Sequence, residues 1–278
     1  MSVLSNLAPD FCVIAPVAYL PQFCKNRRHL VLAHLVDTCN EYANYYWELQ
    51  HGTDDDHYII MDNGAFELGE SYKPNELVRL AKKCGANAVV LPDYPFRPAQ
   101  VTIDAAEDMV DNVHAAGFDT FYCPQSTTGD WGDWVRGYEW GARHDQIDII
   151  GMSILAIPNA LPHIPAAYAR VVATALLQES GVFDSDKYHH YLGSNAGMAL
   201  EVPPLLKMGA LDSVDSSNPV WHAILGHEYS KNTDSYLPVK KVSMSVQFDY
   251  PLSTDSETLR RIQHNVDLTF NLFDDRKV

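Results

Sequence analysis

The chain has 278 residues, 46% of them hydrophobic and 20% charged, which is typical of a soluble globular protein. No apolar run is as long as a membrane span, and the N-terminal residues lack the basic start and apolar stretch of a signal peptide. The formal net charge of −16 disfavours general adhesion to nucleic acid, although a local basic path remains open through Lys207, Lys231, Lys240 and Lys241.

The five cysteines are widely spaced and include no C-x-x-C pair. This pattern argues against a disulfide framework and against a structural zinc site, so no metal and no cofactor are expected. A reduced, cytoplasmic setting is the simplest interpretation of unpaired cysteines.

Apolar runs of strand length alternate with helix-like segments along the whole chain. The expected strands are 12–20, 58–61, 88–92, 120–123, 147–155, 190–193, 210–214 and 240–248. The segments with helical periodicity that follow them are about 28–49, 74–85, 102–117, 130–143, 164–181, 198–209, 220–226 and 255–273. The second of these begins with Pro74 and ends with Gly85, which are typical helix-boundary residues.

Strand–helix pairs that repeat in this way predict a parallel sheet. Eight of them favour closure into a barrel over an open sheet. No G-x-G-x-x-G fingerprint of a dinucleotide-binding fold follows the first strand, and no repeat or linker divides the chain. The sequence therefore predicts an α/β protein in which residues 1–278 form one single-domain (β/α)8 TIM barrel.

In such barrels the catalytic groups lie at the C-terminal ends of the strands. The polar residues expected there are Asp62, Asp93, Gln125, Ser153, Ser194, Asn195 and Asp215. Three carboxylates that converge on one mouth shift each other's pKa and cost stability, so a purely structural use of all three is awkward. Each aspartate taken alone also fits a solvated loop residue or a helix cap. Strand alternation sends Asp212 to the face opposite Asp215.

Other chemistries find less support in the sequence. The first expected strand has no H-x-H pair, and His189 and His190 could lend one metal ligand at most. No lysine lies inside a central strand for Schiff-base chemistry, and GMSILA lacks the second glycine of a G-x-S-x-G elbow. A glycosidase-like pair of carboxylates stays an open alternative.

One segment resembles a known motif. MDNGAFE (61–67) is similar to the D-S-G-G-F-Q motif of the tRNA-guanine transglycosylase family at Asp62, Gly64 and Phe66. Further similar segments follow in that family's order, namely LPD (91–93), CPQST (123–127), IIGMSI (149–154), HYLGSN (190–195) and LDSVDSSNP (211–219). The resemblance covers about residues 60–220, with one motif at each successive strand end.

The resemblance implies a (β/α)8 barrel that exchanges guanine in a nucleic acid for a free 7-deazaguanine base. Asp215 matches the family's nucleophile, whose carboxylate attacks C1′ and holds the sugar covalently. Asp62 matches the general acid/base, and the residues matched to base binding are Asp93, Gln125, Gly151, Met152, Phe66, Leu192 and Gly193. The target base would have to leave its stack to reach them.

Two departures bear on the substrate. No cysteine follows Cys123, so the zinc-binding subdomain of the tRNA enzymes is not expected, and the family's P-T-R becomes NPVWH. Both favour the DNA-acting branch of phages and bacterial islands, with DNA as partner and the host cytoplasm as location if phage-encoded. The alternatives are a tRNA-guanine transglycosylase, a non-catalytic accessory subunit of that family, and an unrelated barrel hydrolase or lyase with convergent aspartates. A homodimer stays open, and no membrane partner is expected.

Overall fold

A computed structural model describes residue 4 and residues 8–52, 56–194, 198–230 and 245–273. These residues contain one sheet of eight strands. The strands are β1 (Asp10–Val13), β2 (Arg28–Val31), β3 (Tyr58–Met61), β4 (Ala88–Val90), β5 (Asp119–Tyr122), β6 (Ile149–Gly151), β7 (Tyr188–Tyr191) and β8 (Ser213–Ser216).

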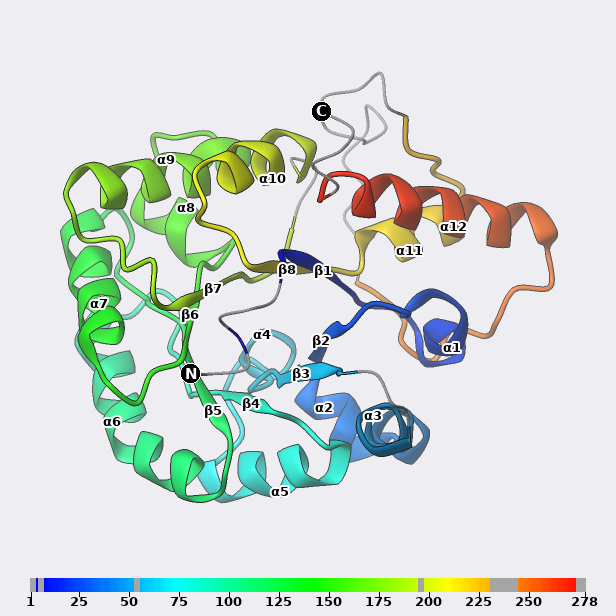
Figure 1. Ribbon diagram of the computed structural model, residues 1–278, viewed down its shortest axis with the longest axis horizontal. Coiled ribbons are helices and arrows are strands. Elements are labelled where there is room, and N and C mark those ends of the chain that lie inside the picture. Colours follow the sequence, from blue (N-terminus) through cyan, green and yellow to red (C-terminus); the bar gives the residue numbers. More distant parts are fainter. Residues whose placement is uncertain (1–3, 5–7, 53–55, 195–197, 231–244, 274–278) are drawn as a thin grey trace.

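All paired strands are parallel, and their order in the sheet is β1-β8-β7-β6-β5-β4-β3-β2. The two edge strands, β1 and β2, lie next to each other, so the sheet curls into a nearly closed barrel (Figure 1). The protein is a single-domain (β/α)8 barrel, which confirms the fold class predicted from the alternating pattern.

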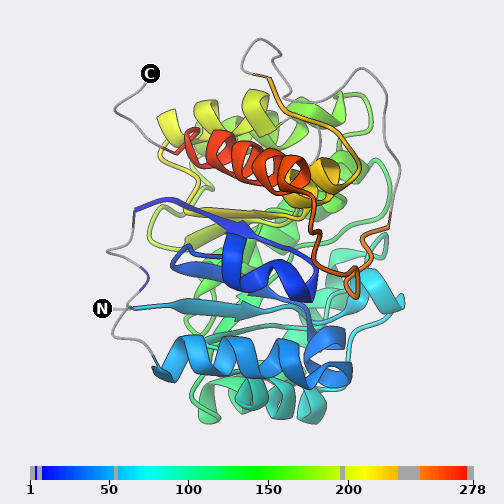
Figure 2. The ribbon, with the colours of Figure 1, turned by 90° about the vertical axis from the view of Figure 1, so that its right-hand side faces the viewer.

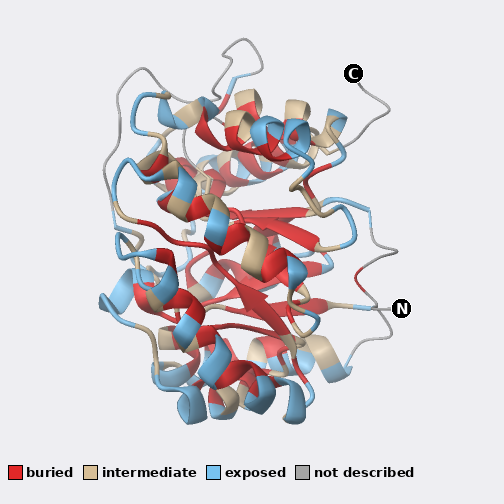
Figure 3. Cartoon of the chain, turned by 90° about the vertical axis from the view of Figure 1, so that its left-hand side faces the viewer, coloured by how far each residue is buried: buried red, intermediate tan, exposed pale blue. Residues whose placement is uncertain are grey.

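The helices form a ring outside the strands, with buried residues on their inner sides (Figure 3). They are α1 (Leu20–Phe23), α2 (Ala33–Thr38), α3 (Asn40–Gly52), α4 (Ala65–Leu68), α5 (Pro74–Cys84), α6 (Ala99–Ala115), α7 (Trp131–Arg143), α8 (Ala156–Ala160), α9 (Ala166–Glu179), α10 (Met198–Lys207), α11 (Asn218–Ile224) and α12 (Ser256–Phe270). Among the described residues, none of these helices has both the length and the apolar character needed to span a membrane.

The parallel register decides which side chains point into the barrel. His190 pairs with Gly151 on one side and with Ser213 on the other, and Asp215 pairs with Cys12. Residues in register on neighbouring strands share a face, and residues two apart on one strand share it too. His190, Ser213 and Asp215 therefore all face the barrel interior.

The strand expected over 12–20 ends at Val13 in the structure, and α1 begins at Leu20. Two further expectations about the elements are corrected. The predicted helix over 28–49 begins instead with strand β2, and α2 and α3 follow it. The expected strand over 240–248 lies partly outside the described residues, and its described part, 245–248, forms no strand. The barrel still has eight strands, because β2 takes a place between β1 and β3.

Two smaller shifts concern residues named as candidates. Asp215 lies inside β8 rather than after it, and His189 lies inside β7 rather than just before the strand expected over 190–193. Of the basic path considered from the sequence, Lys207 ends α10, and Lys231, Lys240 and Lys241 lie outside the described residues.

The connection between β1 and β2 contains the four-residue helix α1 where a barrel of this kind usually has a long helix. Figures 1 and 2 both show α1 between α12 and α3, over the seam where the barrel's two edge strands meet. Phe11 of β1 packs edge-to-face on Phe270 of α12, with ring centroids 5.6 Å apart. The last helix therefore seals the outer face of this seam.

Candidate functional site

Asp215 lies at the C-terminal end of β8, where only 5% of its surface is exposed. Its Oδ1 atom is 3.0 Å from Nε2 of His190 and accepts a 2.7 Å hydrogen bond from the Gly193 N–H. Among the described residues no donor is bonded to Oδ2. The carboxylate is thus anchored through one oxygen, Oδ1.

His190 is fully buried and is held from both sides of its ring. Nδ1 lies 2.6 Å from the Ser213 hydroxyl, and the ring packs edge-to-face on Phe121. A hydroxyl can donate to a neutral imidazole, which leaves the opposite nitrogen as an N–H donor. We assign this tautomer from the hydrogen-bond network, with Ser213 donating to His190 and His190 donating to Asp215.

Gly193 directs its backbone N–H at Asp215 from a conformation that side chains disfavour. Its backbone is left-handed, with φ at 69°, and a Cβ atom there would lie 2.9 Å from Cγ2 of Ile154. A left-handed backbone strongly favours glycine. A side chain at this position would also collide with Ile154, so the local backbone that directs the N–H at the carboxylate suits glycine best.

A buried ion pair fixes the loops around this glycine. Arg170 of α9 makes a two-pronged contact with Glu201 of α10, with N···O distances of 2.6 and 2.5 Å. Its guanidinium also donates to the carbonyls of Met152, Leu192 and Gly193 at 2.8–3.0 Å. The ends of β6 and β7 are therefore tied together behind the site by one side chain.

Asp62 follows β3 and is half-buried among other carboxylates. Burial, and then the charges of Glu67 and Asp93, raise its pKa to about 8, against the lowering effect of hydrogen bonds such as that from the Gly64 N–H. Burial and the charge of Asp215 likewise raise the pKa of Glu67, whose side chain is 22% exposed. A pKa of about 8 favours the protonated form of the Asp62 carboxyl group at neutral pH, and in that form the group can donate.

Asp93 is bound by two amides in the same mouth. Asn63 donates to its Oδ1 at 2.8 Å, and Gln125 donates to its Oδ2 at 2.6 Å. Burial raises the pKa of Asp93, and these two hydrogen bonds oppose the rise. Because a carboxylate has about four acceptor positions, Asp93 keeps the capacity to accept from a ligand.

The remaining predicted base-binding residues differ in how they are used. The Met152 N–H donates to the His190 carbonyl at 2.8 Å, so it is engaged inside the barrel. A Cβ atom on Gly151 would lie 2.4 Å from the Phe121 ring, which explains the glycine by packing. Leu192 is half-buried and its carbonyl accepts from Arg170, whereas Phe66 is 74% exposed at the mouth.

Ser153 and Ser194, two further polar residues expected at strand ends, follow β6 and β7. Ser153 accepts from the N–H groups of Leu155 and Ala156 and so starts α8. Asn195 lies outside the described residues, and the carbonyl of its neighbour Ser194 accepts from Asn218.

The second aspartate of the LDSVDSSNP segment is in a different place. Asp212 precedes β8, and its Oδ2 accepts a 2.7 Å hydrogen bond from the His189 N–H. This position is at the N-terminal end of the strands, opposite the mouth. Asp212 therefore holds β7 to β8, whereas Asp215 faces the other candidate side chains.

Sequence reasoning missed four residues that shape the site. Asn63 and Glu67 lie within the motif at 61–67 at positions that do not match D-S-G-G-F-Q, and in the sequence His190 suggests at most a metal ligand. Arg170 gave one signal, a lone cation in the apolar run of α9. Such a charge is rarely buried without a partner, so a buried acidic partner could have been expected.

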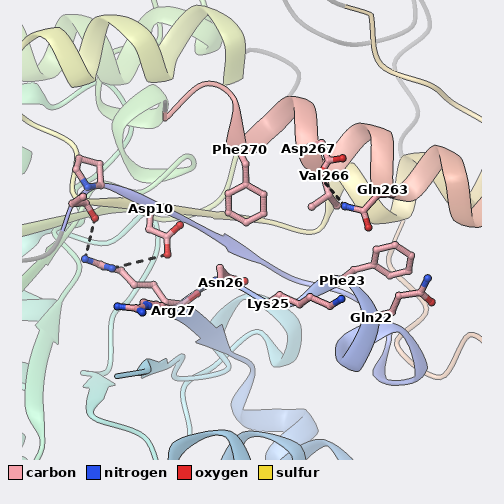
Figure 4. A pocket seen from close by; sticks show the side chains of 13 residues that line it. Asp10, Gln22, Phe23, Lys25, Asn26, Arg27, Gln263, Val266, Asp267 and Phe270 are labelled. Carbon is pink, nitrogen blue, oxygen red and sulfur yellow. Dashed lines mark hydrogen bonds and ion pairs between the residues drawn. The ribbon is translucent and has the colours of Figure 1, made fainter. Parts of the chain in front are cut away.

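A pocket of about 660 Å³ lies away from these residues, on the outside of the barrel between α1 and α12 (Figure 4). Four of its polar side chains are paired within the lining, since Arg28 contacts Asp10 and the Ala8 carbonyl, and Gln263 donates to Asp267. The convergent carboxylates, the histidine and the raised pKa values are at the mouth. We therefore place the candidate active site at the mouth and not in this pocket.

Fold and geometry together define a (β/α)8 barrel with an acidic mouth and one carboxylate anchored by a histidine. Within the part of the chain that the structure describes, no three or more His, Cys, Asp or Glu side chains are grouped so as to hold a metal ion. No protein-family model matches the chain, and no curated protein matches it either.

Proposed function

We propose that the protein is a base-exchange transglycosylase that replaces guanine in DNA by a 7-deazaguanine base. The observation that carries this proposal is the anchored carboxylate of Asp215, which shares the mouth with a protonated Asp62. A nucleophile beside an acid is the pair that glycosyl transfer needs. The motif resemblance over residues 60–220 supports the choice of guanine as the leaving base.

In the first half-reaction Oδ2 of Asp215 attacks C1′ of the target nucleotide, and the bond from C1′ to N9 of guanine breaks. The electron pair of that bond stays with guanine, which takes a proton from Asp62. The sugar is then held as an ester on Asp215. Oδ1 becomes the carbonyl oxygen of the ester and keeps its two donors, His190 and Gly193.

In the second half-reaction the incoming 7-deazaguanine gives its N9 proton to Asp62, and N9 attacks C1′. Asp215 leaves as a carboxylate, and the donors on Oδ1 stabilise the charge that returns to it. One glycosidic bond breaks and one forms, so the exchange needs no further reactant. Asp62 ends protonated, ready for the next cycle.

The base edge is read by Asp93 and Gln125 in this proposal. A carboxylate accepts from the ring N–H and the amino group that guanine and 7-deazaguanine share, and the Gln125 amide can donate to their carbonyl oxygen. In the free protein Gln125 donates to Asp93 instead. This internal hydrogen bond helps to keep the empty site ordered. Binding of the base exchanges it for hydrogen bonds to the ligand.

The test is an exchange assay with labelled guanine or a labelled 7-deazaguanine and three polymers, namely duplex DNA, single-stranded DNA and tRNA. We expect label to enter DNA with the wild-type protein and to be lost with Asp215→Asn. Label that enters tRNA alone would move the assignment to the tRNA branch. Absence of label from all three polymers would reject the transglycosylase function.

A further inference from the structure

The loop after β4 contains an unusual turn at the rim of the mouth. The Arg97 N–H donates to the Tyr94 carbonyl at 3.2 Å, so Pro95 and Phe96 are the two central residues of the turn. Phe96 has φ at 65°. Proline at the second position and a positive φ at the third define a type II turn, in which the third position favours glycine or asparagine.

Phenylalanine is therefore in a place where its backbone is strained. A left-handed conformation is a genuine outlier for a bulky residue. Among the described residues other than glycine, Phe96 is the one with a positive φ. Its side chain is 55% exposed, so burial does not explain why the ring is kept. Because burial of the ring does not offset the backbone strain, we infer that the ring has a function.

The surroundings of Phe96 indicate which ligand the ring would meet. Tyr94 in the same turn is 42% exposed, and Phe66 of α4, the short helix after the neighbouring strand β3, is 74% exposed. Arg97 is exposed, and no described acidic group pairs with it. The turn thus carries two aromatic rings and a cation a few residues beyond Asp93.

We propose that Phe96, with Tyr94 and Arg97, forms a stacking platform for unpaired DNA bases beside the target nucleotide. The inference rests on the proposed function, because it takes DNA as the substrate. Carboxylates at the mouth and a net charge of −16 repel a phosphate backbone. The protein would therefore bind the DNA strand mainly through its bases. Aromatic side chains stack on any base, and a nearby arginine adds contact to base or phosphate.

The experiment measures the affinity for a fluorescent single-stranded DNA that contains guanine, by anisotropy, in a set of variants. Phe96→Gly and Phe96→Asn both suit the left-handed backbone and remove the ring. We expect each to bind at least about 10-fold more weakly, the loss typical of one stacked base. Phe96→Trp should bind within about twofold of wild type, because it keeps a stacking ring.

Two controls separate stacking from damage to the fold. Trp47 on α3 is similarly exposed, at 47%, and Trp47→Ala should leave DNA affinity unchanged. The melting temperature of Phe96→Gly should be no lower than that of wild type, since the substitution relieves backbone strain. A clear fall in that temperature would show that the ring is held for packing and would overturn the proposal.

The proposal is also overturned if wild type does not bind the strand, or if Phe96→Gly and Phe96→Asn bind as tightly as wild type. Failure of the parent function looks different. If wild type incorporates labelled base and Phe96→Gly shows the same KM for DNA, the platform alone is wrong. If no label enters any polymer but Phe96→Gly still loses DNA affinity, the transglycosylase function alone is wrong.

Discussion

His190 and Asp215 face each other across neighbouring strands inside the barrel mouth, with Nε2 and Oδ1 separated by 3.0 Å. The Ser213 hydroxyl lies two residues before Asp215 on the same strand and contacts the far side of the imidazole. Ser213, His190 and Asp215 therefore form a chain of hydrogen bonds between two strands. This chain ends on Oδ1 of Asp215, and Oδ2 is not part of it.

The first prediction concerns this hydrogen bond. His190→Leu removes the side-chain donor to Oδ1, and we expect exchange to fall about 10- to 100-fold, the value of a hydrogen bond to a charged group. His190→Gln keeps an N–H donor near the position of Nε2 and should retain most of the activity. Equal losses in the two variants, measured as kcat/KM for base exchange, would show that His190 only fills space.

A second prediction follows from the pKa of Asp62, which is about 8 in the folded protein and near its ordinary value of 3.8 in the unfolded chain. Between these values the folded protein binds more protons, so the free energy of unfolding falls as pH rises from about 4 to about 8. Asp62→Asn lacks this titration. Its melting temperature relative to wild type should therefore rise across the same window, and a difference that does not change with pH would contradict the raised pKa.

A third prediction concerns the pH dependence of catalysis, which the raised pKa of Asp62 should determine. If Asp62 donates the proton to guanine, formation of the covalent intermediate requires its protonated form. From neutral pH upward, single-turnover rates should be flat to about pH 8 and fall about tenfold per pH unit above it. Rates that keep rising above about pH 8 would assign the proton transfer to another group.

The buried ion pair behind the site gives a fourth prediction. Arg170→Met leaves Glu201 buried without its partner, which typically costs about 3–5 kcal/mol of stability. The double variant Arg170→Met, Glu201→Leu should recover part of that loss in denaturant unfolding. Exchange should stay impaired in the double variant, because the carbonyls of Met152, Leu192 and Gly193 have lost their common donor. Full exchange in a stable double variant would remove Arg170 from any positioning role.

The barrel could be predicted because strand–helix units alternate along the chain, although one of the eight expected strands, 240–248, forms no strand in its described part and β2 takes its place in the count. The assignment of 28–49 to a single helix was wrong, because RHLV is only four residues long and runs directly into helical periodicity. In the described part of 240–248, alternating burial comes from packing of a segment that is not a strand. Residues 246 and 248 are half-buried and 245 and 247 are exposed, and the Phe248 carbonyl accepts from the N–H of Val17, which begins the short 3-10 helix after β1.

The site could be predicted only in part, for a related reason. Strand ends can be read from apolar runs, so Asp62, Asp93 and Asp215 could be named before the structure. Contacts between different strands depend on register, which a single sequence does not define. The donors to Asp215 come from β7 and the loop after it, and Arg170 reaches the site from an outer helix.

The central claim is that Asp215 forms a covalent bond to the sugar of the target nucleotide. The measurement is a denaturing gel of the protein with single-stranded DNA or tRNA and no replacement base, under conditions that remove the released guanine. We expect a protein–DNA adduct with wild type and no adduct with Asp215→Asn, while Asp212→Asn still forms it because Asp212 lies at the opposite end of the strands. An adduct that persists in Asp215→Asn and disappears in Asp212→Asn would contradict the account.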